Sequence, residues 1–95
     1  MIKSFADKET QRLFEGRRSK AVSGQAQRRA QVKLAQLDQA KSVEELKVPP
    51  GNRLHKLGGD REGYWAISVD EQYRILFRFD EGAGDAYGVE ATDYH

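Results

Sequence analysis

Two histidines, His55 and His95, are the first candidates for chemistry in this sequence. Histidine has the side-chain pKa nearest neutrality, so it can take up or release a proton at physiological pH without a large shift. A metal site would need carboxylates to complete it, because the chain has no cysteine, no third histidine and no H-x-x-x-H spacing. We therefore expect neither a metal nor another cofactor, and we interpret the histidines as candidates for acid–base catalysis.

Cleavage of RNA is a reaction that such groups can carry out. The 2′-hydroxyl is an internal nucleophile, so the reaction needs a base to deprotonate it, an acid for the 5′-oxygen and a cation for the crowded phosphate. Arg74 is a candidate for the cation, because a guanidinium offers two donors to two phosphate oxygens and stays charged. The chain ends in Asp93, Tyr94 and His95, which bring three more polar groups together.

Each of these residues also has a purely structural interpretation. His55 fits a half-buried histidine with one satisfied nitrogen, and His95 fits a frayed terminus. Arg74 and Arg78 fit a solvated strand face or the partners of nearby carboxylates. Residue spacing alone leaves both interpretations open.

The segment 73–80, Y-R-I-L-F-R-F-D, alternates at the period of a β-strand and would position Arg74. The predicted apolar face consists of Tyr73, Ile75, Phe77 and Phe79, and the opposite face of Arg74, Leu76, Arg78 and Asp80. Arg74 and Arg78 are four residues apart, or about 13 Å at a rise of ~3.3 Å per residue. The strand therefore predicts a sheet with a dry side and a basic side.

The first half of the chain is predicted to be helical. Asp7 is the expected N-cap of a helix that runs to about Glu15 and ends at Gly16. A second, amphipathic helix is expected over residues 25–40, where apolar residues recur at spacings of four and three: Ala26, Ala30, Leu34 and Leu37. A capping-box pattern at residues 42–45 then predicts a short helical turn.

The prolines at residues 49–50 stop the helical pattern, and the rest of the chain is predicted to be extended. Strands are expected over residues 54–57, 64–69, 73–80 and 86–92, with residues 2–5 as a short edge strand. In the last strand we expect Tyr87, Val89 and Ala91 to face the core. Helices followed by a meander predict an α+β fold with the helices on one sheet face.

Length and composition agree with a single domain over residues 1–95, because 95 residues leave little room for a second core. The net charge of +1 does not by itself indicate nucleic-acid binding. No segment resembles a signal peptide or a membrane span, so we expect a soluble, cytoplasmic protein with no membrane association.

The motifs taken together resemble the HigB group of bacterial toxins. The likeness covers the opening M-I-K-S-F, the run L-H-K-L-G-G-D-R-E-G-Y-W at residues 54–65, the Y-R-I at 73–75 and the final D-Y-H. It implies a RelE-like fold, with two N-terminal helices and a short third on one face of a small, mostly antiparallel sheet. The opposite, concave face would be the active site.

The resemblance also implies function. Such toxins are endoribonucleases that cleave mRNA in the A site of the ribosome without a metal, and a HigA-type helix-turn-helix antitoxin neutralises them. His55 matches the strand histidine of the family and Arg74 the arginine that steadies the phosphate. Asp93, Tyr94 and His95 match its functional C-terminal tripeptide, in which Asp93 would orient a histidine and Tyr94 the substrate. One histidine would be the base and the other the acid, in either order.

One departure from the family concerns a lysine beyond the strand histidine, where this chain has Gly58. Lys56 is the nearby replacement that we expect. The further RNA contacts that we expect are Arg53, Arg61 and Arg78, and such phosphate contacts weaken as salt rises.

Two alternatives share the fold: a ParE-type toxin that binds DNA gyrase and cleaves no RNA, and a non-catalytic binding module. The acid–base residues favour the nuclease. Their geometry poses one difficulty, because strict alternation sends Asp93 and His95 toward the core side of the sheet and Tyr94 toward the basic side. The tail would have to twist or leave the strand near Thr92 for all three to reach Arg74.

Overall fold

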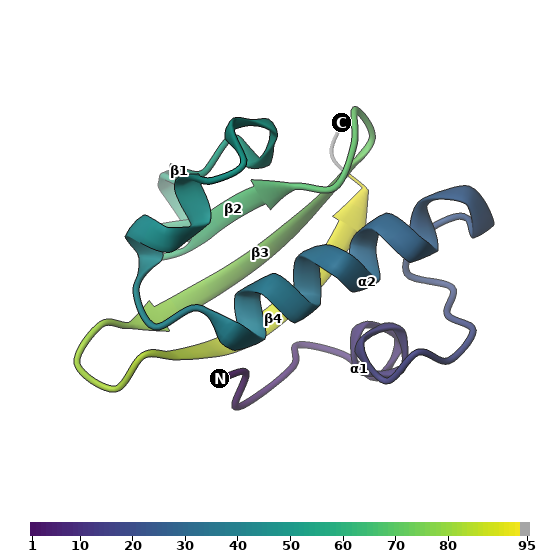
Figure 1. Cartoon of the computed structure of the whole chain (residues 1–95), viewed down its shortest axis with the longest axis horizontal. Coiled ribbons are helices and arrows are strands. Elements are labelled where there is room, and N and C mark those ends of the chain that lie inside the picture. Colours follow the sequence, from purple (N-terminus) through teal and green to yellow (C-terminus); the bar gives the residue numbers. More distant parts are fainter. Residues whose placement is uncertain (94–95) are drawn as a thin grey trace.

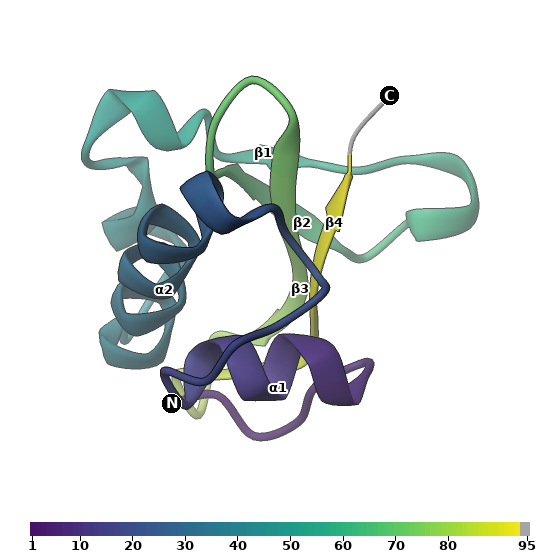
Figure 2. The same cartoon turned by 90° about the vertical axis from the view of Figure 1, so that its right-hand side faces the viewer.

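Two α-helices lie on one face of a four-stranded antiparallel sheet in a computed structural model, which describes residues 1–93 (Figure 1). The helices are α1 (Lys8–Phe14) and α2 (Gly24–Gln39), and the 3₁₀ turns are η1 (Val43–Lys47), η2 (Pro50–Asn52) and η3 (Gly59–Arg61). The strands β1 (His55–Lys56), β2 (Trp65–Ser68), β3 (Tyr73–Asp80) and β4 (Asp85–Asp93) pair in chain order. Figure 2 shows α2 and the loop that carries η3 on opposite sides of the sheet. The predicted α+β, RelE-like architecture is confirmed.

The start and end of α1 follow from its flanking residues. The carboxylate of Asp7 accepts a hydrogen bond from the Thr10 N–H at 2.7 Å, so the predicted N-cap is confirmed. Gly16 has φ +79°, a left-handed conformation that only glycine adopts without strain, and the helix stops before it as predicted.

The capping box predicted at Ser42 does not form. Residues Val43–Lys47 make a 3₁₀ turn, and the Ser42 side chain makes no capping hydrogen bond. The Val43 N–H instead donates to the carboxylate of Glu81 at 3.2 Å, and Glu45 accepts from the Lys41 N–H. A long-range contact with the β3–β4 turn therefore replaces the local cap.

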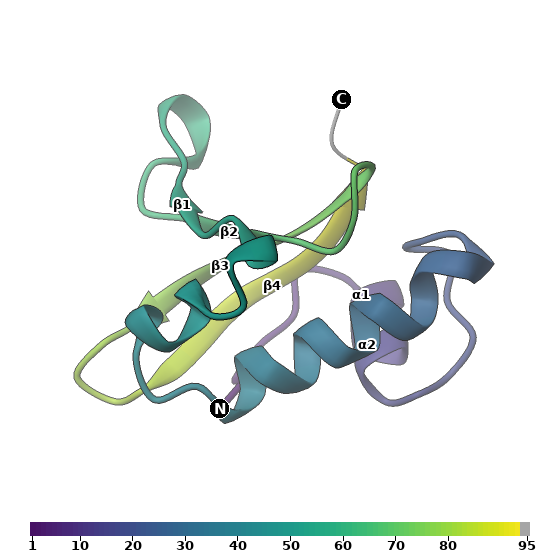
Figure 3. The ribbon, with the colours of Figure 1, turned by 45° about the horizontal axis from the view of Figure 1, so that its top comes forward.

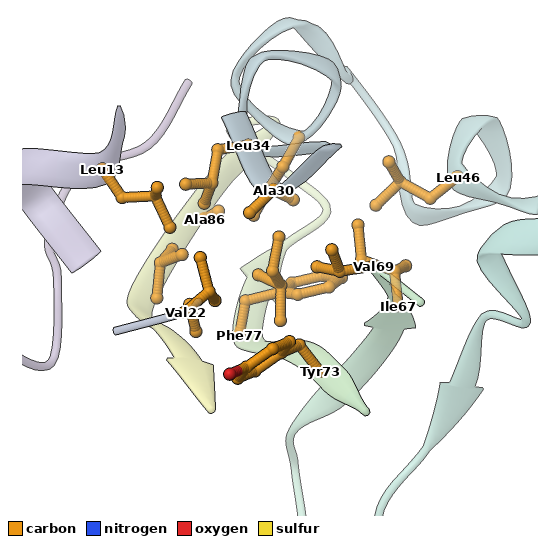
Figure 4. Packing of buried hydrophobic residues seen from close by; sticks show 14 of the residues in the cluster. Leu13, Val22, Ala30, Leu34, Leu46, Ile67, Val69, Tyr73, Phe77 and Ala86 are labelled. Carbon is orange, nitrogen blue, oxygen red and sulfur yellow. The ribbon is translucent and has the colours of Figure 1, made fainter. Parts of the chain in front are cut away.

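The core lies between α2 and the helix-facing side of the sheet (Figure 4). Phe77 and Ile75 of β3 are fully buried there, together with Ile67 of β2. The predicted apolar stripe of α2 covers them with four buried residues: Ala26, Ala30, Leu34 and Leu37. Tyr73 is buried beside them, and its hydroxyl accepts a hydrogen bond from the Ser23 N–H at 3.0 Å. The dry face predicted for β3 is confirmed.

The N-terminal segment lies along β4 and pairs with it in parallel. Ile2 and Phe5 form isolated bridges with Ala86 and Val89, so the predicted edge strand is reduced to two bridges. Within residues 1–93, none of the helices has both the length and the apolar character that a membrane span requires.

A β-bulge at Gly88 overturns one prediction for β4. Leu76 pairs with Glu90 but Arg78 pairs with Tyr87, so β4 holds one more residue than β3 between these pairs. The extra residue reverses which side chains of β4 face the core in the part of the strand before Gly88. Ala86 is buried in the core in place of Tyr87, so the inward orientation predicted for Tyr87 is wrong. The same prediction is confirmed for the next two inward positions, Val89 and Ala91, which are buried.

Candidate active site

The candidate site is the face of the sheet that the helices leave uncovered, which we call the open face. Figure 3 shows α1 and α2 below the sheet and the loop of η3 above it. Residues paired across antiparallel strands point to the same face, so the strand register assigns side chains to rows across the open face. Three such rows contain three of the predicted site residues, His55, Arg74 and Arg78.

The middle row, which we call the histidine row, runs from β1 to β4 through four paired residues: His55, Ala66, Leu76 and Glu90. Ala66 is fully buried and Leu76 is buried too, so the centre of the row is an apolar floor. His55 and Glu90 stand at its two ends, about 14 Å apart at ~4.8 Å per strand. The floor therefore separates an imidazole from a carboxylate.

The imidazole of His55 is held in one tautomer. Its Nδ1 lies 2.8 Å from the backbone carbonyl oxygen of Arg53. A carbonyl oxygen only accepts hydrogen bonds, so Nδ1 must carry the proton and Nε2 of the neutral ring has a lone pair. The structure thus shows the half-buried histidine with one satisfied nitrogen, and the same contact leaves Nε2 able to accept a proton.

The second row, the arginine row, contains Ser68, Arg74 and Thr92. Nη1 of Arg74 donates to the carbonyl oxygens of Asp70 at 2.8 Å and Tyr73 at 3.2 Å, which holds the guanidinium at the β2–β3 turn. Arg74 and His55 lie two strands and two residues apart, or about 12 Å between Cα atoms. A long arginine side chain and an imidazole can approach one phosphate across that separation.

The predicted C-terminal tripeptide is only partly described. Asp93 pairs with Tyr73, so its side chain starts on the helix side of the sheet, opposite to Arg74 and Thr92. Its carboxylate accepts a hydrogen bond from Gln72 Nε2 at 3.0 Å. Tyr94 and His95 lie outside the described residues. The catalytic roles of the tripeptide remain a prediction.

The four basic residues predicted to contact RNA are placed differently from one another. Lys56 pairs with Trp65 on the helix side of the sheet, and its ammonium lies 5.2 Å from the Trp65 ring, so it does not join His55 on the open face. Arg53, which supplies the carbonyl to His55, forms an exposed ion pair with Glu71 at 3.4 Å. Their RNA contacts remain predictions.

Arg61 and Arg78 are brought together by a residue that the sequence analysis did not single out. Both guanidinium groups lie against the ring of Tyr64, at 5.4 and 5.7 Å from its centroid. Arg61 also forms an ion pair with Glu90 at 3.3 Å, which connects it to the histidine row.

Tyr64, Arg78 and Tyr87 form a third row, the tyrosine row. Arg78 pairs with Tyr87, and Tyr64 precedes the Trp65–Phe77 pair. The sequence does contain a signal for this row, which is Gly88 inside the last predicted strand. An isolated glycine in a strand often marks a bulge, and a bulge here places Tyr87 on the open face.

A separate hollow of the described chain lies elsewhere. It has a volume of about 720 Å³ and lies between α2 and the β2–β3 turn, on the helix side, where Arg28, Arg29, Lys33 and Arg53 line it. Burial, with a smaller contribution from the charge of Arg29, lowers the pKa of Lys33 there. Asp70 and Glu71 line this hollow as well, but neither His55 nor Arg74 does, so we place the candidate site on the open face. Within residues 1–93, no three histidine, cysteine, aspartate or glutamate side chains gather as they would around a metal ion.

Comparisons with known proteins identify the family of this chain. Residues 3–95 match a sequence model for the family described as "RelE-like toxin of type II toxin-antitoxin system HigB". The chain is 42% identical over all 95 residues to a protein of Proteus vulgaris named Endoribonuclease HigB, with both chains fully covered. It is 32% identical over 83 residues to Toxin HigB-1 of Vibrio cholerae, covering 86% of this chain and 87% of that one. This chain therefore belongs to the HigB family of RelE-like toxins of type II toxin–antitoxin systems.

Proposed function

We propose that this toxin is a ribosome-dependent endoribonuclease that cleaves mRNA in the A site of the small subunit and so arrests translation. The observation that supports this most is the open face, where the histidine with a fixed tautomer and the anchored arginine stand in neighbouring rows. The name of the Proteus vulgaris relative supports the same reaction.

In the proposed mechanism, Nε2 of His55 takes the proton of the RNA 2′-hydroxyl. The 2′-oxygen then bonds to phosphorus while the bond from phosphorus to the 5′-oxygen breaks, which leaves a 2′,3′-cyclic phosphate. With His55 assigned as the base, His95 gives a proton to the departing 5′-oxygen. Asp93 would orient a histidine, and Tyr94 would position the substrate.

Arg74 would stabilise the charge that develops on the phosphate. Its Nη1 is already bonded to the carbonyl oxygens of Asp70 and Tyr73, so the guanidinium needs little reorganisation when the substrate binds. Donors that are preorganised toward developing charge typically contribute a factor of about 10² to 10³ in rate. No step of this mechanism requires a metal.

The proposed partners follow from the family and from this reaction. A HigA-type antitoxin with a helix-turn-helix would neutralise the toxin, and the ribosome would place both in the cytoplasm. Arg61 on the open face and Arg53 beside His55 would contact RNA phosphates, and Arg78 would contact the RNA as well. Lys56 would reach RNA only past the edge of β1, because it lies against Trp65.

The test is the effect of Arg74→Ala on single-turnover cleavage of mRNA on programmed ribosomes. We expect the cleavage rate to fall by about 10² to 10³ and ribosome affinity to change by only a few fold, because the guanidinium acts on charge in the transition state. Arg12→Ala is the matched control, since Arg12 lies on α1 and forms a surface ion pair with Glu9. It should cleave like the wild type.

Two outcomes would contradict the proposal. Equal losses in affinity and rate would remove the transition-state role of Arg74. Growth arrest by the wild type without mRNA cleavage, accompanied by a change in DNA supercoiling, would establish the gyrase-binding alternative instead.

A further inference from the structure

The tyrosine row borders a hollow of about 470 Å³ that the mechanism above does not use. Arg78, Tyr87, Phe79, Gly63 and Asp80 line it. The row lies next to the histidine row, about 7 Å away at two residues per row. A ligand in this hollow would therefore be a direct neighbour of a phosphate held near His55.

The side chains around the hollow suit a nucleobase better than a phosphate. One guanidinium and one carboxylate, those of Arg78 and Asp80, offset each other in charge, so the hollow has no strong attraction for an anion. The half-buried ring of Tyr87 and the exposed, planar guanidinium of Arg78 are both surfaces on which bases stack.

The guanidinium of Arg78 is held in place without an ion pair. It lies 5.7 Å from the centre of the Tyr64 ring, and no carboxylate of residues 1–93 comes within ion-pair distance of it. Arg61, on the same ring, is in contrast paired with Glu90. Within residues 1–93 no ion pair therefore competes with a stacked ligand for the Arg78 guanidinium.

The bulge at Gly88 is what creates this row. Gly88 has φ +60°, and its N–H donates to the hydroxyl of Ser4 at 2.8 Å, so the N-terminal segment satisfies the backbone of the bulge. Bulges near functional sites commonly redirect a side chain. Here the bulge turns Tyr87 from the core to the open face.

Gly88 also forms the base of the row. A side chain at this position would begin 3.5 Å from the Tyr64 hydroxyl and 3.9 Å from Nε and Nη2 of Arg78. A methyl group there would make van der Waals contact with the Tyr64 hydroxyl and the Arg78 guanidinium, whereas a larger side chain would enter the row.

From these contacts we propose that the tyrosine row is a subsite for the base of a nucleotide that flanks the scissile phosphate. The base stacks on Tyr87 and on the guanidinium of Arg78, which lies against the Tyr64 ring. This inference rests on the proposed function, because it names a substrate contact of the same site.

The test combines an mRNA that lacks one base with a variant that lacks the Tyr87 ring. Ribosomes are programmed with mRNA that is abasic at the nucleotide before or after the cleavage position. We expect one of these two changes to lower kcat/KM of the wild type by about tenfold or more, the size of one base-stacking contact. The same abasic change should have almost no further effect on Tyr87→Leu. Tyr87→Phe keeps the ring and should respond like the wild type.

Tyr87 is half-buried, so its replacement also affects packing. Arg78 is exposed, and Arg78→Gln is therefore the second variant. We expect it, too, to reduce the loss of kcat/KM that the abasic nucleotide causes. The proposal is overturned if Tyr87→Leu and Arg78→Gln keep the full abasic effect. It is also overturned if the two variants lose antitoxin binding but still respond fully to the abasic nucleotide. The row would then be a contact with the antitoxin. A wild type that cleaves no RNA would refute the proposed function and this subsite together, whereas cleavage with an unchanged abasic effect would refute the subsite alone.

Discussion

His55 shows how a single contact can serve both structure and chemistry. The bond from Nδ1 to the Arg53 carbonyl holds the ring at the start of β1, and the same bond leaves Nε2 as the nitrogen that can accept a proton. A histidine that only supported the loop would need Nδ1 and not Nε2. The two roles can therefore be separated by substitution.

His55→Asn makes that separation. The asparagine amide can occupy the place of Nδ1 and donate to the Arg53 carbonyl, but nothing replaces Nε2. We expect cleavage to fall by about 10² or more, the usual contribution of a positioned base, while the thermal unfolding midpoint stays close to that of the wild type. Cleavage assays and circular dichroism measure the two quantities. Full activity in His55→Asn would show that His55 acts only through structure.

At the scale of the elements, β4 is the strand that the sequence describes least well. The pattern Y-G-V-E-A at residues 87–91 alternates as a regular strand would, and this gave the wrong face for Tyr87. Only the glycine inside the pattern signals the bulge, and the contact that satisfies it comes from Ser4, 84 residues away in the chain. A long-range hydrogen bond of this kind has no local signature.

Gly88→Ala tests the backbone of the bulge. A left-handed conformation costs an alanine about 1–2 kcal/mol, and the neighbouring atoms leave room for the methyl group, so backbone strain is the main effect. We expect chemical denaturation to show a loss of stability of that size. Gly58→Ala is the control, because Gly58 has a negative φ and open space around it. Similar losses in both variants would mean that the bulge is not specially strained.

Other elements follow closely from the sequence. The dry face of β3, the stripe of α2 and the cap at Asp7 rest on local spacing, and the structure has all three. Strict alternation also placed Asp93 on the helix side correctly. The face on which Lys56 lies depends on the register between β1 and β2, which the sequence does not specify.

At the scale of the whole molecule, one buried side chain connects α2 and η1 to the segment that leads into the strands. Asn52 is fully buried between α2, η1 and the approach to β1. Its amide nitrogen donates to the Leu46 carbonyl at 3.0 Å and to the Gln36 side chain at 3.1 Å, and its oxygen accepts from the Lys33 ammonium. The amide satisfies three polar groups from two segments.

Removing that amide should therefore weaken the whole fold. In Asn52→Ala the Leu46 carbonyl and the partly desolvated Lys33 ammonium lose their partner, and each unsatisfied buried group costs about 1–3 kcal/mol. A loss of about 2 kcal/mol in a domain of this size would lower the thermal midpoint by roughly 10 °C, measured by circular dichroism. Gln39→Ala removes an exposed amide from the same helix and should change the midpoint little. A midpoint in Asn52→Ala as high as in Gln39→Ala would show that water replaces the lost amide, and that the two halves are joined by the apolar core alone.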